Sequence, residues 1–131
     1  MHKEIINPAT LGNAVGPFAR SVRVGGILYI SGTSALSHLS GPLSERVLSP
    51  DFDDQARHTF ANIEKVLVSC GLGMDDLFKV IVMLKRKEDY VRLNALRSEL
   101  FPSAEVASTT FIADLIRSDM LIEVEANALF R

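Results

Sequence analysis

The feature that most constrains the fold of this 131-residue chain is a run of five consecutive apolar residues, Val80-Ile81-Val82-Met83-Leu84. The run is far shorter than the roughly 20 residues that a membrane helix needs. It leaves no polar face, so we interpret residues 78–85 as a strand that is buried on both sides. The sheet that contains this strand must therefore be covered on both faces.

Two amphipathic helices are predicted around this strand. In residues 50–70, apolar residues recur at spacings of three and four and form one stripe. Ser49 is suited to cap this helix, and Gly71 follows its last turn. The second helix is predicted over residues 88–101, with Pro102 just past its end. Its expected inward residues are Tyr90, Leu93, Leu96 and Leu100.

The remaining periodic segments predict strands. Residues 21–24 and 27–30 form a hairpin in which Gly25 and Gly26 both take positive φ values. Residues 108–112 and 121–130 supply two further strands. The expected fold class is α+β: one domain over residues 1–131, with a mixed sheet and both helices on one face. A second protomer is then the simplest cover for the other face, and we expect an oligomer.

Composition narrows the classes of function. The chain carries 14 Lys and Arg against 16 Asp and Glu, a net charge of −2, which gives no electrostatic footprint for nucleic acid or an anionic membrane. One cysteine, Cys70, excludes an internal disulfide framework and a cysteine-based zinc site, and it is expected to be buried and structural. No basic-then-apolar leader opens the chain, so we expect a cytoplasmic protein.

Familiar catalytic motifs are absent from the sequence: it contains no GxSxG, P-loop, Rossmann glycine fingerprint or HExxH. The three histidines, His2, His38 and His58, are not expected to act in catalysis or to bind a metal. His58 lies four residues after Asp54 on the predicted helix, and a surface ion pair between them is the expected arrangement.

The strongest candidates from the residues alone are two carboxylates, Glu123 and Glu125, on one face of the last strand. If that face is solvated, both are ordinary surface residues. If it lines a cleft between protomers, one of them is a desolvated acid or base with a raised pKa. The pattern leaves both readings open. The segment from Ser31 to Ser34 offers backbone N–H groups and hydroxyls suited to binding a carboxylate. Asn94 lies on the second predicted helix, at a position where an amide side chain usually faces water.

Several short segments together resemble the reactive intermediate deaminase family (RidA, formerly YjgF). The similar segments, in chain order, are Asn7-Pro8, Gly16-Pro17-Phe18, Leu28-Tyr29-Ile30-Ser31-Gly32-Thr33, Gln55-Ala56-Arg57 with Asn62-Ile63 and Gly71-Leu72, Lys79 to Leu84, Asp89-Tyr90 with Leu93-Asn94 and Phe101-Pro102, and Ile122-Glu123-Val124-Glu125-Ala126. The resemblance covers almost the whole chain.

The resemblance implies a chorismate-mutase-like α+β fold, assembled as a homotrimer with sites in the clefts between subunits. It implies hydrolysis of enamines or imines, such as 2-aminoacrylate, to a keto acid and ammonia, without a metal or cofactor. By position, Glu123 matches the glutamate that orients the attacking water. Ser31, Gly32 and Thr33 match the segment that positions the substrate, and Asn94 matches the pocket amide.

The sequence departs from the family pattern at two positions. The arginine that grips the substrate carboxylate falls on Ala107 or Ser108, and the tyrosine common in the opening motif is Phe18. Neither Ala107 nor Ser108 can make the two-pronged contact that arginine makes. Arg117, in the loop before the last strand, is a candidate substitute, and the hydroxyls of Thr33, Ser108, Thr109 and Thr110 are candidate substrate contacts.

Two functions are therefore expected. The first is hydrolytic deamination of an imine or enamine that is larger, or less dependent on its carboxylate, than 2-aminoacrylate. The second is binding of a small metabolite, such as a carboxylic acid, without turnover in a trimer of the same fold, which the missing arginine favours.

Overall fold

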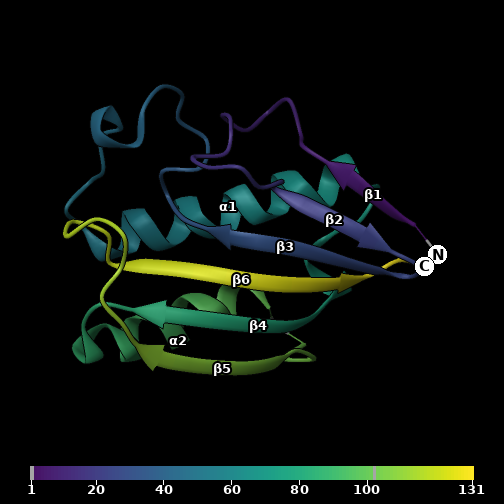
Figure 1. Cartoon of the computed structure of the whole chain (residues 1–131). Helices are drawn as coiled ribbons and strands as arrows, with labels where there is room; N and C mark the ends of the chain where they lie inside the picture. Colours follow the sequence, from purple (N-terminus) through teal and green to yellow (C-terminus); the bar gives the residue numbers. More distant parts are fainter. Residues whose placement is uncertain (1, 102) are drawn as a thin grey trace.

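The computed structural model describes residues 2–101 and 103–131, and in this part of the chain six strands form one sheet with two helices on one of its faces (Figure 1). The strands are β1 (Lys3–Ile6), β2 (Ser21–Val24), β3 (Ile27–Thr33), β4 (Leu77–Leu84), β5 (Ala107–Ile112) and β6 (Ile122–Leu129). The helices are α1 (Phe52–Ser69) and α2 (Tyr90–Leu100), and single 3-10 turns lie at η1 (Leu43–Glu45), η2 (Met74–Asp76) and η3 (Lys87–Asp89).

The strand order is β1-β2-β3-β6-β4-β5, so the last strand of the chain lies in the middle of the sheet. All neighbouring strands are antiparallel except β4 and β5, which are parallel and are connected through α2. This confirms the predicted mixed sheet with both helices on one face. The strand β1, which pairs with β2, was not predicted, because its four residues are too few to show a period.

The core lies between the sheet and the helices. Alternate residues of β6 are fully buried there: Ile122, Val124, Ala126 and Ala128. On α1, the inward stripe includes Ala56, Phe60, Ile63 and Leu67, as the spacing predicted. Side chains of a strand point alternately to its two faces, so the residues between them on β6, which begin with Glu123 and Glu125, lie on the other face. We call this the open face.

The prediction that β4 is buried on both sides is wrong for the single chain. Val80, Val82 and Leu84 are completely buried against the helices, but Ile81 and Met83 are only half-buried and Phe78 is exposed. Ile81 and Met83 lie on the open face, opposite Glu125 and Glu123 of β6. The apolar run thus contributes one set of side chains to the core and another to a face that this chain leaves uncovered.

The predicted ends of α1 and the predicted β2–β3 turn are mostly correct, with differences at single residues. Asp51, not Ser49, caps α1, since its carboxylate accepts from the N–H of Asp54. Cys70 is the C-cap residue that follows the last residue of α1, and it is half-buried at the edge of the core rather than fully buried. In the β2–β3 turn, only Gly25 has a positive φ, of 58°.

The second helix ends at Leu100, and the predicted break at Pro102 lies outside the described residues. Leu93 and Leu96 are buried, but Tyr90 is exposed rather than inward. Within the described ranges, neither helix combines the length and the apolarity that crossing a bilayer requires.

Candidate functional site

Glu123 lies on the open face of the sheet, near the start of β6 and opposite Met83 of β4. Its side chain is half-buried, and no side chain of the described residues donates a hydrogen bond to its carboxylate. Burial raises the pKa of the Glu123 carboxyl, and the like charge of Glu125 raises it further. Burial and the neighbouring negative charge both destabilise the ionised carboxylate, so Glu123 holds a proton more tightly than an ordinary glutamate does.

A β-bulge brings Gly32 against this carboxylate. Ile30 pairs with Ala126 and Thr33 pairs with Val124, so two residues of β3 stand opposite one residue of β6. A Cβ on Gly32 would lie 3.0 Å from Oε1 of Glu123 and 3.2 Å from its Cδ. The absence of a side chain at Gly32 thus makes room for the glutamate.

Hydrogen bonds fix the shape of the bulge. The Ser31 N–H donates to the carbonyl of Arg20 at 3.0 Å, and Ser31 Oγ donates to the carbonyl of Ala19 at 2.7 Å. The buried hydroxyl of Thr33 donates to the carbonyl of Ser31 at 2.8 Å. Ser31 and Thr33 therefore hold the backbone around Gly32, and the Thr33 hydroxyl already has a partner within the bulge.

Phe18 is tethered to the same region through the bonds that Ser31 makes to residues 19 and 20. Phe18 is 49% exposed, and its N–H donates to the carbonyl of Gly16 at 2.8 Å. It lines a hollow formed by residues 7–20, together with the mostly buried Arg20, whose guanidinium donates to the carbonyls of Gly12, Asn13 and Ser37.

The register of β5 divides the predicted site residues between the two faces. Ser108 pairs with Val80 and Thr110 with Val82, so these hydroxyls lie on the helix side of the sheet. Thr109 and Ala107 lie on the open face, opposite Ile81 and Lys79. Within one chain, therefore, Ser108 and Thr110 do not share a pocket with Glu123.

Of the two positions on which the family arginine could fall, Ala107 is the one on the face of Glu123. It is nevertheless four residues from Phe111, which lies in the same row of the sheet as Met83 and Glu123. At about 3.3 Å per residue, that offset is roughly 13 Å along the strand. A methyl group at this position has no donor for a carboxylate.

The side chains of Arg117 and Asn94 form hydrogen bonds with residues other than Glu123. Arg117 forms an ion pair with Asp119, with 2.5 Å between Nη2 and Oδ2, and donates to the carbonyls of Leu43 and Arg46. Its guanidinium thereby ties the loop before β6 to the η1 segment. Asn94 lies on the helix side of the sheet, where its Oδ1 accepts from Arg97 Nη2 at 2.8 Å.

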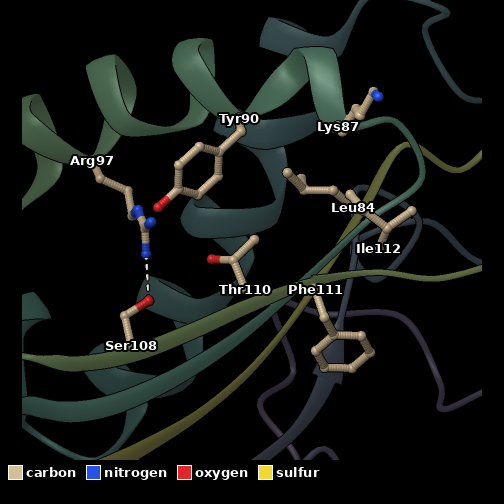
Figure 2. Close-up of a pocket in the computed structure, with 8 residues that line it drawn as sticks. All are labelled: Leu84, Lys87, Tyr90, Arg97, Ser108, Thr110, Phe111 and Ile112. Atoms are coloured by element: carbon tan, nitrogen blue, oxygen red, sulfur yellow. Dashed lines mark hydrogen bonds between the residues drawn. The ribbon is translucent and has the colours of Figure 1, made fainter.

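Two arrangements were not predicted from the sequence. Arg97 was not identified as a site residue from the sequence, yet it is half-buried between α2 and β5, directly after the inward Leu96 (Figure 2). His58 does not pair with Asp54; its ring lies against that of His38, with 5.1 Å between centroids. Across residues 2–101 and 103–131, no three His, Cys, Asp or Glu side chains cluster as metal ligands would.

Comparison with known proteins identifies the family. The family model described as "Endoribonuclease L-PSP" matches residues 9–130. The chain belongs to this family. Solved structures with the same fold include a Yersinia pestis protein described as belonging to the conserved Rid protein family and the YjgF gene product of E. coli. Together with the family match, they confirm the resemblance drawn from the sequence motifs.

Relatives of this Rid-family chain match it over nearly their whole length. A RutC family protein of Pyrococcus horikoshii is 29% identical over 96% of this chain and 97% of its own. A protein of Dermatophagoides farinae named 2-iminobutanoate/2-iminopropanoate deaminase is 27% identical over 95% of this chain and 94% of its own. The crystal structure of E. coli TdcF with bound serine superposes with a TM-score of 0.83 at 22% identity, covering 98% of this chain and 99% of that one. The predicted fold is thereby confirmed.

Proposed function

We propose that this protein is a cofactor-independent hydrolase that deaminates an imine or enamine metabolite in a cleft between the subunits of a homotrimer, with Glu123 as the residue that orients water. The observation that carries the proposal is the Glu123 carboxyl, which is half-buried on an uncovered sheet face, has a raised pKa and receives no hydrogen bond from a side chain of the described residues. A relative named for 2-imino acid deamination adds support.

Glu123 suits the role of a general base. A carboxylate with an ordinary pKa is a weak base at neutral pH, and raising the pKa brings it closer to the pH at which it works. Burial and the neighbouring Glu125 both act in that direction. The bulge at Gly32 leaves space beside the carboxylate, because any side chain there would crowd Oε1.

In the proposed reaction, Glu123 takes a proton from water while the water oxygen forms a bond to the imine carbon. The imine nitrogen gains a proton, which gives a carbinolamine. Glu123 supplies the proton that the imine nitrogen gains in this step and then takes the hydroxyl proton of the carbinolamine. It passes this second proton to the nitrogen as the carbon–nitrogen bond breaks and the carbonyl forms, so Glu123 ends the cycle deprotonated. One water is consumed, and one carbonyl compound and one ammonia are released, with no change in oxidation state.

The substrate is proposed to depend less on a carboxylate than 2-aminoacrylate does. The family arginine falls on Ala107 or Ser108, of which Ala107 is on the open face, and Phe18 stands where tyrosine is common. Both replacements remove polar groups that would bind a small acidic substrate. A charge-assisted hydrogen bond contributes roughly 1.5–3 kcal/mol, so a small 2-imino acid loses about 10–100-fold in affinity.

The open face supports the assembly part of the proposal. Ile81 and Met83 lie half-buried on it, and Tyr29 and Leu129 are exposed apolar residues of the same sheet. Burial of such side chains against neighbouring copies contributes roughly 25 cal/mol per Å² of apolar surface. A trimer would also exclude water from Glu123 and raise the pKa of its carboxyl further.

The test measures ammonia and keto-acid formation from 2-imino acids generated in situ from a panel of amino acids by an amino acid oxidase. Glu123→Gln should lose activity by at least about 100-fold, whereas Glu125→Gln should retain it within a few-fold. Activity on 2-aminoacrylate should be much lower than that of an arginine-bearing relative measured alongside. Equal losses in the two variants would show that the wrong carboxylate has been assigned.

The alternative is a trimer that binds a metabolite without converting it, and the observation that favours it is Ala107. The same panel distinguishes the two functions. Saturable binding of a keto acid or imine analogue that is lost in Glu123→Gln, together with no ammonia release from any substrate, would support binding alone and overturn the hydrolase.

A further inference from the structure

Residues 34–39, which follow β3 and which we call the His38 turn, are attached to α1 through the buried side chain of Asn62. Asn62 is 1% exposed, and its Nδ2 donates to the carbonyl of Ser34 at 2.9 Å. The same nitrogen lies 3.1 Å from Nδ1 of His38, whose side chain is half-buried. One amide group of α1 therefore contacts the turn at its first residue and at its histidine.

These two contacts determine the protonation of His38. If the amide of Asn62 were turned round, its Oδ1 would face the carbonyl oxygen of Ser34, and two acceptors would meet; the nitrogen therefore occupies this place. An amide nitrogen only donates, so Nδ1 of His38 accepts and the ring proton is on Nε2. A protonated ring carries an N–H at Nδ1 as well, and it would place two donors 3.1 Å apart.

The groups that α1 presents to His38 also oppose its protonation. The ring of His58 lies against it, with 5.1 Å between the ring centroids, and Lys65 follows two turns later on the same helix. Burial lowers the pKa of His38, and the positive charges of His58 and Lys65 lower it further. The hydrogen bond, the burial and the charges therefore all favour the neutral imidazole.

The His38 turn supports the loop of residues 7–20. The carbonyl of Ser37 accepts from the N–H of Gly12 at 3.0 Å and from Nη2 of Arg20 at 3.1 Å. Arg46 Nη1 donates to a second carbonyl of the turn at 3.1 Å. These two arginines are positive as well, and in the part of the chain that the structure describes no Asp or Glu forms an ion pair with His38. A positive charge on His38 therefore gains no compensating partner.

We propose that His38 is a pH-sensitive switch: its neutral imidazole attaches the His38 turn to α1, and its protonation at mildly acidic pH loosens the turn and the loop of residues 7–20. Protonation removes the acceptor at Nδ1 and places a new positive charge beside His58 and Lys65. The proposal concerns a movement of the fold and does not depend on whether the protein is a hydrolase.

The direction of the pH dependence follows from the two states of the turn. In the loosened state His38 is solvated and titrates near its ordinary value of about 6.5, whereas in the attached state its pKa is lower. The loosened state therefore binds the proton more tightly. Attachment is complete above about pH 6.5, weakens as the pH falls below that value, and reaches its weakest level below the pKa of the attached state.

The experiment measures amide hydrogen exchange of the assembled protein at pH 7.5 and pH 5.0, with each rate compared with the intrinsic rate at that pH to give a protection factor. The reporting amides are those of Gly12, Ser37 and Leu39, which donate to carbonyls of the His38 turn. Their protection should be roughly 10-fold lower at pH 5.0, as a difference of about one pKa unit between the two states gives. The amides of β4 and β6 should keep their protection within a few-fold.

Three variants separate the histidine from other effects of acid. In His38→Asn, the side-chain Oδ1 is as many bonds from the backbone as Nδ1 of histidine is, and it accepts a hydrogen bond at both pH values; protection of the turn should then be the same at pH 7.5 and pH 5.0. His2→Asn, at an exposed position, is the matched control and should lose protection as the wild type does. His58→Gln removes a facing charge and should reduce the loss.

The NMR titration of the His38 ring is an independent measurement, and it should give a midpoint below pH 6.5 in the wild type and a higher midpoint in His58→Gln. The proposal is overturned if the turn of the wild type has equal protection at both pH values, or if β4 and β6 lose protection as much as the turn does. It is also overturned if His38→Asn behaves as the wild type, or if the wild-type ring titrates at or above pH 6.5. Circular dichroism at both pH values shows whether each variant is folded.

Discussion

Gly32 and Glu123 fit against each other across the β3–β6 bulge, with only 3.0 Å between the place of a Gly32 Cβ and Oε1 of Glu123. The backbone at Gly32 does not have a positive φ, so alanine is sterically compatible with its own backbone there. An alanine at position 32 would therefore be crowded by the Glu123 carboxylate and not by its own backbone conformation. The close approach joins the segment that the sequence marked for substrate positioning to the residue that it marked for water activation.

Gly32→Ala tests this relationship. The added methyl group should displace the Glu123 carboxylate and lower hydrolysis by roughly 10–100-fold, since misplacement by about 1 Å can cost that much. Stability should change by less than about 1 kcal/mol, because the carboxylate end can move away. Gly26→Ala is the matched control, as a Cβ there meets no atom within 4 Å. If both variants hydrolyse at the wild-type rate, the carboxylate position does not matter.

Glu125 should set the pH at which activity is lost. The general base must be deprotonated, so kcat/KM should fall as the pH drops through the pKa of Glu123. The charge of Glu125 raises that pKa, and Glu125→Gln should therefore move the acidic limb of the pH profile to lower pH. Glu64→Gln, on the exposed side of α1, should leave the limb in place. A shift toward higher pH in Glu125→Gln would contradict the assignment.

Glu123 should also lower the stability of the fold at neutral pH. Because the pKa of its carboxyl is raised in the folded protein, the native state binds this proton more tightly than the unfolded chain does. The free energy of unfolding therefore falls as the pH rises from the unfolded pKa to the folded one, and the penalty is complete above the folded pKa. Glu123→Gln should stabilise the protein at pH 8 and do so less at pH 4, as measured by urea unfolding at fixed protein concentration. An equal gain in stability at both pH values would show that the raised pKa of Glu123 is not its cause.

The open face should hold the subunits together. Ile81→Glu places a charge among the half-buried side chains of that face and should convert the proposed trimer to monomers, as measured by light scattering after size exclusion. Val91→Glu is the control, because Val91 is 80% exposed on α2. Retention of the wild-type mass by Ile81→Glu, with an unchanged circular dichroism spectrum, would exclude this face as the interface.

The two possible arginine positions can be separated by restoring the side chain. Ala107→Arg puts a guanidinium on the face of Glu123 and should raise kcat/KM for small 2-imino acids roughly 10–100-fold. Ser108→Arg puts it on the helix side, next to Arg97, and should not raise the activity. A gain from Ser108→Arg alone would mean that the active cleft lies on the helix side.

Local patterns were enough to predict most elements of the fold. The stripe of α1, the alternation of β6 and the apolar run of β4 each reflect contacts that recur at a fixed spacing along the chain. The family motifs added the position of Glu123, because their order and spacing are properties of the sequence itself. The strand β1 was missed because it is stabilised by pairing with β2 and contributes no residues to the fully buried core.

Whether two residues share a site was decided only in three dimensions. Ser108 and Ala107 are adjacent in the sequence, yet they lie on opposite faces of the sheet, and the register with β4 determines which residue faces Glu123. Gln55 is a similar case: it is 1% exposed and bonds to the backbone of Ser49, Asp119 and Leu121, which come together only after folding.

The sequence by itself therefore determined most of the elements and the fold class, and it predicted Glu123 as the candidate carboxylate, since periodicity and motif spacing are local. The tertiary structure decided the open face, the contact between Gly32 and Glu123, and the place of Arg97 beside β5, because each depends on how distant strands and helices meet.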